Sequence, residues 1–350
     1  MSHPEASLAG PSTPRRRAPW IVIAPVAILL LLAAGWTAAW FYASSRVQDE
    51  INHWVVREAA QGRNWSCGSL SFGGFPFRFE LICEAPSLAF TGASQWKADA
   101  ARAHAVAQVW DPQHIIAEFK GPARIVETAT GKELTANWSL LQASGVGANG
   151  KPERVSVSAN DYALTQGSTS LFAAKHVEVH VRHHPGDAGP TLDVAAGMHA
   201  ATGPALGGTA PAPVDGELQA QVTAVPEFRS MPLDERLRLW QGAGGRLNLV
   251  LGKLSSGGGT MVTTGNLGLD DRGRPSGEAQ LSVVGPERLV AALGASGLMP
   301  ADLAGFAPMV MAAGTPTQVD GRKGAAFPFQ FRDGRVFLGF IPLGKIGPLY

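Results

Sequence analysis

Apolar positions divide the chain into one long apolar run and a much longer region in which apolar and polar residues alternate. Residues 1–14 are polar and contain prolines, and we expect no fold there. From Trp20 to Tyr42 the chain has no charged residue. In a helix these 23 residues cross the ~30 Å hydrocarbon core of a bilayer. The pattern therefore predicts one transmembrane helix over 20–42.

Charges beside the apolar run indicate its orientation. Arg15–Arg17 lie directly before it, and the positive-inside rule places them in a cytoplasmic tail over 1–19. Arg46 and Arg57 on the far side reduce the asymmetry. A cleaved signal peptide is the alternative, but its apolar segment is normally only about 7–15 residues long. We expect a single-pass protein of the bacterial inner membrane, with its C-terminal domain in the periplasm.

After the apolar run, apolar residues recur at the spacing of an amphipathic helix. Their spacing of three or four residues predicts a short helix over 43–63 that leads out of the membrane. The residues on this apolar side are Val47, Ile51, Trp54, Val55 and Ala59.

Beyond residue 64, apolar and polar residues alternate, which is typical of strands with one buried face. Clear examples are Phe77–Leu81, Val155–Ala159 and Val177–Val181. Two hairpins are also predicted, over 266–284 and over 327–341, because turn residues separate their strands. Consecutive hairpins of this kind form a meander.

Some segments of the 64–350 region do not alternate. Helical patterns over Pro232–Trp240, and over 286–293 with a continuation at 301–313, predict short helices. The Gly-, Pro- and Ala-rich stretch 186–213 is either a loop or a divide between two sub-domains. We expect one extracytoplasmic β-rich domain over 64–350.

Composition favours a mainly β fold of the β-rich α+β type. Charged residues make up 16%, and the 42 glycines and 25 prolines favour short strands and turns over long charged helices. We expect a curved antiparallel sheet with a few short helices. The net charge of +1 provides no field that would attract nucleic acid, so we expect no such partner.

Cys67 and Cys83 are the only cysteines, and both lie in the region that we place outside the cytoplasm. An oxidising compartment favours a disulfide between them, which would close the ends of a hairpin-like segment bent at Gly73-Gly74 and Pro76. Two unlinked buried thiols are the alternative. A metal pair is disfavoured because no CxxC spacing and no neighbouring His is present.

Between the cysteines lies the apolar motif GFPFRFEL. Phe75, Phe77 and Phe79 are expected to alternate onto one face, with Pro76 interrupting strand pairing at the bend. The motif is interpreted either as a core hairpin or as a surface that lines a lipid site.

A histidine-rich strand, AAKHVEVHVRHH, is the one segment that suggests metal binding. His176, His180 and His184 are weak candidate ligands on one face, with Glu178 between the first two. However, ~3.3 Å per residue puts the first two about 13 Å apart along the strand. We therefore expect a solvated polar face, with metal binding or pH sensing as alternatives, and no bound metal or cofactor.

Catalytic motifs are not recognisable. The stretch Gly145–Lys151 has the GxxxxGK spacing, but Pro152 stands where a P-loop needs Ser or Thr, and a strand follows instead of a helix. Asp270 and Asp271 fall in a predicted turn and are interpreted as turn formers. We expect no enzymatic activity and no catalytic residues.

The segment from Cys67 to Leu88, with GFPFR between the cysteines, resembles the signature of an uncharacterised, mainly alphaproteobacterial family of membrane-anchored extracytoplasmic proteins. The tail Phe331–Gly339 is similar to a second family motif. The resemblance implies the topology above and no catalytic residues. A more distant similarity, in the strand and Asp-Gly pattern, is to AsmA-like envelope proteins, which implies a curved sheet that binds lipid.

Three functions follow as hypotheses. The first is an envelope protein that binds lipid or another hydrophobic ligand in a β-sheet groove. The second is a structural or assembly scaffold that binds other envelope proteins. The third and least favoured is a metal-dependent or other hydrolase. An apolar groove would support the first hypothesis, whereas a closed core with polar surfaces would contradict it.

Overall fold

A computed structural model describes residues 20–91, 95–148, 151–186, 189–203, 213–226, 231–285 and 314–350. The chain forms two compact units, residues 1–51 and 52–350. The first contains most of a long helix, and the second contains the end of that helix and a large sheet.

Helix α1 (Trp20–Ala60) is continuous through the predicted membrane span and the predicted amphipathic segment. It is the one helix in the described chain that is long and apolar enough to cross a membrane. The predicted helical segment over 43–63 is three residues too long. Gly62 adopts a positive φ of 79°, which ends the helix, and a strand begins at Arg63.

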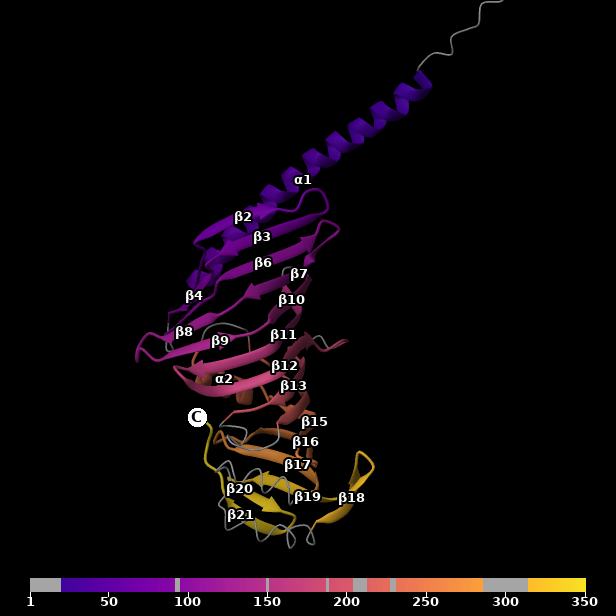
Figure 1. Ribbon diagram of the computed structural model, residues 1–350. Helices are drawn as coiled ribbons and strands as arrows, with labels where there is room; N and C mark the ends of the chain where they lie inside the picture. The colour runs from indigo at the N-terminus through magenta and orange to yellow at the C-terminus, as the bar shows by residue number, and fades with distance from the viewer. Residues whose placement is uncertain are drawn as a thin grey trace, which may run out of the picture. The chain divides into compact units, whose positions relative to one another are not determined.

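The second unit consists mainly of antiparallel strands in one curved sheet that is not closed, which confirms the predicted fold class (Figure 1). Its strands are β1 (Arg63–Ser66), β2 (Ser69–Gly73), β3 (Arg78–Glu84), β4 (Ser87–Phe90), β5 (Trp96–Asp99), β6 (Arg102–Gln108), β7 (Asp111–Lys120), β8 (Ala123–Glu127), β9 (Glu133–Asn137), β10 (Leu140–Ala148), β11 (Lys151–Gln166), β12 (Thr169–His183), β13 (Leu192–Ala201), β14 (Val214–Val222), β15 (Leu247–Ser256), β16 (Gly259–Leu269), β17 (Pro275–Val284), β18 (Thr315–Val319), β19 (Arg322–Arg332), β20 (Arg335–Leu338) and β21 (Ile341–Lys345).

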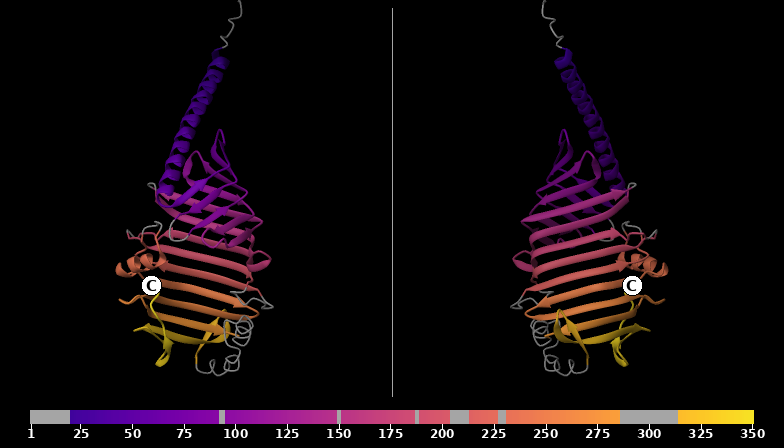
Figure 2. Two further views of the ribbon diagram at one scale, coloured as in Figure 1. Left: turned by 90° about the vertical axis from the view of Figure 1, so that its left-hand side faces the viewer. Right: turned by 90° about the vertical axis from the view of Figure 1, so that its right-hand side faces the viewer.

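The central ladder follows the chain. Each strand from β10 to β16 pairs with the next one in the chain, and β17 pairs with β19. All these pairs are antiparallel, and Figure 2 shows the strands lying side by side. The sheet divides at β11, where one half of the strand pairs with β10 and the other half with β9. One branch continues through β7, β6, β3 and β2, and the other through β8, β5, β4 and β1.

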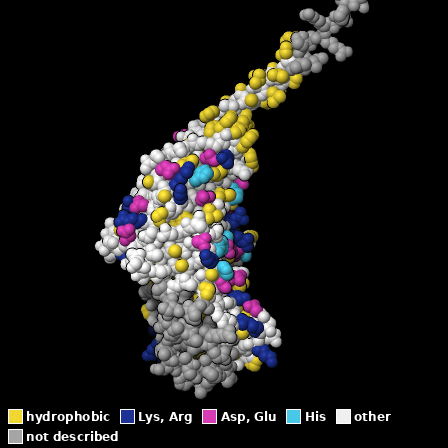
Figure 3. Space-filling view, in the orientation of Figure 1, with side chains coloured by type: hydrophobic (Ala, Val, Ile, Leu, Met, Phe, Trp, Pro, Cys, Tyr) yellow, Lys and Arg dark blue, Asp and Glu magenta, His cyan; other side chains and the backbone are white. Residues whose placement is uncertain are grey.

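Cross-strand register gives the ladder one apolar and one polar face, because directly paired residues point to the same side of a sheet. On one face, Val179 of β12 pairs with Ala196 of β13, which pairs with Leu218 of β14. On the other face, Arg182 pairs with Asp193 in the same two strands β12 and β13. Figure 3 shows charged and histidine side chains gathered beside β10 to β13.

The predicted hairpins over 266–284 and 327–341 are confirmed as β16–β17 and β19–β20, although Ile341 belongs to β21. Helix α2 (Leu233–Gly242) confirms the helix predicted over 232–240, with Pro232 at its N-cap. The predicted helices at 286–293 and 301–313 lie outside the described residues.

The interpretation of 186–213 as a loop was wrong for Leu192–Ala201, which forms β13 and pairs on both sides. Its Ala and Gly residues conceal the alternation, because small side chains contribute little contrast between the two faces.

Candidate functional site

An apolar pocket of about 560 Å³ lies across strands β12 to β16. Its floor is made by three small residues from consecutive strands, Ala196, Gly216 and Gly252. Larger apolar side chains of the same face stand around this floor, and they come from three adjacent cross-strand rows: Val177, Val179, Met198, Leu218, Leu249, Leu254 and Met261. The result is an apolar trough that crosses the strands.

The apolar face is open to solvent next to this trough. Val155 and Val157 of β11 are 42% and 39% exposed, and Val179 and Leu218 are 46% and 39% exposed. Among the residues that the structure describes, no large side chain is completely buried. The clearest local core lies further along the sheet, where Val283, Ala325 and Phe327 pack together. The strand alternation in β11 to β15 therefore does not serve a closed core.

Aromatic rings extend the trough at one end. Phe172 lines the pocket and lies 6.1 Å from the ring of Tyr162, which stacks on Trp138 with 6.5 Å between centroids. The Trp138 indole donates a hydrogen bond to the Phe119 carbonyl at 2.7 Å. Burial raises the pKa of the Tyr162 hydroxyl. Tyr162 beside this end of the trough is therefore partly shielded from water.

The GFPFR motif forms the predicted hairpin, with β2 paired to β3. Phe79 is buried at 6% exposure on the apolar face, in register with Ala107 of β6. The expectation that Phe75 and Phe77 share this face stays a prediction. Strand β3 begins only at Arg78, so both rings lie in the turn that contains Pro76, where strand alternation does not apply, and both are half or more exposed.

The two cysteines lie at disulfide distance at the other end of this hairpin. The Cys67 and Cys83 sulfur atoms are 2.00 Å apart, and their Cα atoms are 5.5 Å apart. Cys83 is buried and pairs in register with Leu70 on the apolar face of β2. The pair closes the open end of the hairpin where the Gly68 amide donates to the Glu84 carbonyl.

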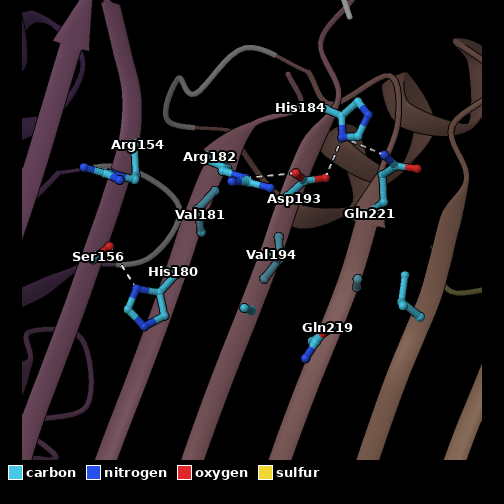
Figure 4. A pocket seen from close by; sticks show the side chains of 13 residues that line it. Arg154, Ser156, His180, Val181, Arg182, His184, Asp193, Val194, Gln219 and Gln221 are labelled. Atoms are coloured by element: carbon cyan, nitrogen blue, oxygen red, sulfur yellow. Dashed lines mark hydrogen bonds and ion pairs between the residues drawn. The ribbon is translucent and has the colours of Figure 1, made fainter. Parts of the chain in front are cut away.

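The opposite face of the same strands carries a polar pocket of about 530 Å³ (Figure 4). Arg182 Nε donates to Asp193 Oδ2 at 3.0 Å, His184 Nδ1 lies 2.9 Å from Asp193 Oδ1, and His180 Nδ1 lies 2.9 Å from Ser156 Oγ. Desolvation is the largest influence on the pKa of Asp193 and raises it. The hydrogen bonds from His184 and Arg182 together outweigh it, so that pKa lies below its ordinary value.

The three weak candidate metal ligands do not converge. His176 Nε2 and His180 Nε2 lie 3.6 and 3.2 Å from the same Glu178 oxygen, whereas His184 pairs with Asp193. The hydrogen bond from His180 is the main cause of a lowered pKa at Glu178; desolvation opposes it and His176 adds to it. In the described ranges, no group of three His, Cys, Asp or Glu residues could hold a metal ion.

Ser156, His180 and Glu178 form a line of hydrogen bonds that resembles a catalytic triad, at 2.9 and 3.2 Å. Acyl transfer also needs N–H donors aimed at the developing oxyanion. Strands β11 and β12 are paired on both sides here, so their backbone N–H groups donate to neighbouring strands. The arrangement is a hydrogen-bonded polar surface.

The trough is not recognisable from the sequence alone. Its floor residues Ala196, Gly216 and Gly252 occupy apolar-face positions where a packed sheet would have larger side chains. The available signal was one small residue in each of three consecutive strands. It becomes readable only when the register between the strands is known, because each strand taken alone shows an ordinary Gly or Ala.

Comparison with known proteins gives one match. No curated protein matches the chain. No solved structure matches it either, so the expected likeness to AsmA-like proteins stays a prediction. The family described as uncharacterised proteins conserved in bacteria (DUF2125) matches residues 40–347, from the last part of the apolar run to the end of the sheet. A match over most of the length shows membership: the chain belongs to this bacterial family of unknown function.

Proposed function

We propose that this protein is anchored in the bacterial inner membrane by α1 and binds a lipid acyl chain along the apolar face of its periplasmic sheet. The observation that supports this proposal most directly is the trough over Ala196, Gly216 and Gly252, beside valines that are about 40% exposed. A contiguous exposed apolar surface of this kind marks a site for a hydrophobic ligand. The occupant that we favour is a single acyl chain, because the apolar lining of the trough crosses five strands.

Dimensions support an acyl chain. The trough crosses five strands, β12 to β16, and four strand spacings of ~4.8 Å give roughly 19 Å. A bilayer core of ~30 Å holds two leaflets, so one acyl chain reaches roughly 15 Å. Burying about ten methylenes at ~0.8 kcal/mol each would contribute ~8 kcal/mol, a magnitude that can offset the ~4–15 kcal/mol cost of association.

The membrane anchor supports the proposal, because it keeps the protein where lipids are available. A chain anchored by α1 remains at the membrane, where lipids are abundant. The cytoplasmic tail 1–19 and the periplasmic location of the sheet follow from Arg15–Arg17, and the Cys67–Cys83 pair at disulfide distance favours an oxidising compartment. We propose no catalytic activity, because the polar face pairs its histidines with carboxylates of the same and neighbouring strands.

Two adjacent alanines provide the test. Ala196 faces the trough, and Ala195 faces the polar side. Full-length protein is extracted in mild detergent, and bound lipid is measured by native mass spectrometry and lipid extraction. We expect Ala196→Phe to retain about tenfold less lipid, the equivalent of ~1.4 kcal/mol, and Ala195→Phe to match the wild type. Wild-type protein without lipid, or equal loss in both variants, would contradict acyl-chain binding.

A second candidate function is a scaffold for other envelope proteins. Strand β21 pairs only with β20 in the described sheet, and all five of its residues are exposed. Phe340, Ile341 and Leu343 are 99%, 63% and 54% exposed. An exposed edge strand with apolar side chains can pair with a strand of another protein. A photo-crosslinker at position 343 in cells would give one discrete protein adduct under this function and none under lipid binding alone.

A further inference from the structure

The polar pocket of about 530 Å³, on the face opposite the trough, contains two arginines in direct register. Arg154 of β11 pairs with Arg182 of β12, so both side chains leave the same face of the sheet from neighbouring strands. Directly paired Cα atoms of an antiparallel ladder lie about 4.5–5.5 Å apart. Like charges placed opposite each other in this way destabilise strand pairing. A negative charge between the two guanidinium groups would remove this cost.

Only one of the two arginines has a counter-charge in the described ranges. Arg182 Nε donates to Asp193 Oδ2 at 3.0 Å, and no bond within those ranges uses its terminal nitrogens. Arg154 forms no ion pair or hydrogen bond there, and Figure 4 shows it outside the hydrogen-bonded group around Asp193. Two arginines and one carboxylate line the pocket, so its net charge is +1 when the histidines are neutral (2 − 1).

The next pair on this face adds polar side chains and no carboxylate. Ser156 pairs with His180 directly beside the two arginines, which makes a block of four residues from β11 and β12. The His180 ring is held by Ser156 Oγ at 2.9 Å and by Glu178 Oε2 at 3.2 Å. Because Ser156 and His180 are bonded to each other, the positive charge available to an anion comes from Arg154 and Arg182.

The two guanidinium groups favour an anion with more than two oxygens. One guanidinium fork is enough to fill both oxygens of a carboxylate. A terminal phosphate group has three oxygens and can accept hydrogen bonds from two forks, and Arg is well suited to bidentate binding of phosphate. Asp193 keeps Arg182 in place through Nε. The Arg154 side chain is exposed and is long enough to turn toward Arg182 on the paired strand.

We infer that Arg154 and Arg182 bind a terminal phosphate group in the polar pocket. This ligand is distinct from the acyl chain of the proposed function, because the two pockets lie on opposite faces of the same strands. Ala195 lines the polar pocket, and Ala196 lines the trough. Two sources offer the same chemistry: a soluble phosphate compound and the phosphorylated headgroup of a lipid.

Calorimetric titration of the full-length protein in phosphatidylcholine nanodiscs tests this inference. The phosphate of phosphatidylcholine is a diester, so the nanodisc itself offers no terminal phosphate group. The probes are inorganic phosphate, glycerol 3-phosphate and a short-chain phosphatidic acid, with acetate as the carboxylate control. We expect the phosphate probes to bind and acetate not to bind.

Variants at Arg154 identify the site. Arg154→Ala should weaken binding of glycerol 3-phosphate about tenfold, because one charged hydrogen-bonding group is lost. Arg154→Lys keeps the charge but not the fork, so its loss should be smaller. Arg272→Ala removes the same charge from an exposed turn outside the pocket and should bind as the wild type does. Since Arg154 is exposed, the thermal midpoints of its variants should stay within a few degrees of the wild type.

Absence of binding for all phosphate probes, or equal binding by the wild type and Arg154→Ala, would overturn the inference. If Arg154 is confirmed, the probes identify the source. Phosphatidic acid that binds about ten times more tightly than glycerol 3-phosphate indicates a lipid headgroup, and equal affinities indicate a soluble phosphate compound. Lipid retention by Ala196→Phe reports the trough separately, so failure of one site is distinguishable from failure of the other.

Discussion

Ala195 and Ala196 are consecutive residues of β13 that face opposite sides of one sheet: Ala195 pairs with His180 and Gln219, and Ala196 pairs with Val179 and Leu218. One step along the chain thus separates a hydrogen-bonded polar surface from an open apolar one. Strand β13 pairs with β12 on one side and β14 on the other at both positions. We therefore expect a substitution at either residue to change the surface of one face and to preserve the strand pairing.

Gly252→Leu should block the trough without unfolding the sheet. A Cβ at Gly252 meets nothing closer than 3.6 Å, so the larger side chain extends into the open pocket. Lipid retention in native mass spectrometry should fall, while the thermal midpoint stays within a few degrees of the wild type. Gly265→Ala is the contrasting control. Its Cβ would lie 2.5 Å from the Glu278 carbonyl, so it should cost ~1–3 kcal/mol in the free energy of unfolding.

Replacing Cys67 and Cys83 together by Ser should destabilise the β2–β3 hairpin. The cysteines are 16 residues apart, and closing a loop of this size is worth about 3 kcal/mol in the chain-entropy model. Denaturant titration of the full-length protein should show a loss of this order. Reducing agent should produce the same shift in the wild type and none in the double variant. An unchanged wild type under reduction would indicate that the thiols are not linked.

Asp270→Asn should weaken the β16–β17 turn. The Asp270 carboxylate accepts the backbone amides of Arg272 and Arg274 at 3.0 and 2.9 Å and the Arg274 guanidinium at 2.7 Å. Loss of the charged acceptor should reduce the free energy of unfolding by about 1–2 kcal/mol. The exposed neighbour Asp271 is the matched control, and Asp271→Asn should be neutral. Equal effects at both positions would contradict the assigned role in the turn.

The polar face should make stability depend on acid pH through Glu178. Hydrogen bonds, chiefly from His180, hold the folded pKa of Glu178 below its ordinary value of 4.5. A carboxyl with a depressed folded pKa stabilises fully above its unfolded pKa, and this stabilisation is lost as pH falls through the folded pKa. Between pH 6 and 3, the thermal midpoint of Glu178→Gln should therefore fall less steeply than that of the wild type. The exposed Glu153→Gln variant should follow the wild type; identical slopes for all three proteins would exclude this role.

Much of the fold was predictable because alternation is a local property. Val177, Val179 and Val181 indicated a two-faced strand, and Asp333-Gly334 indicated a hairpin, since each signal lies within a few residues. The division of the sheet at β11 was not predictable, because it depends on which distant strands pair with each half of β11. Strand β13 was missed because alanine and glycine carry little hydrophobic contrast.

The candidate site shows the same limit. Phe79 was expected on an apolar face and is buried there, but Phe75 and Phe77 lie in the turn before β3, because the start of this strand could not be read from the alternating phenylalanines. The trough could not be predicted at all. Its floor depends on the register that brings Gly216 beside Met198 and Gly252 beside Leu218, and register is a property of the whole sheet.

The division of the sheet at β11 also separates two parts of the chain that differ in how strands can be added to them. Before β11 the strands of the two branches are interleaved along the chain, so neither branch can be gained, lost or exchanged as one contiguous piece of sequence. After β11 the ladder grows by simple hairpins in chain order. A duplicated hairpin inserted there would lengthen the apolar trough by two strand spacings, roughly 10 Å. Under the proposed function, such an insertion would lengthen the acyl chain that the trough accommodates.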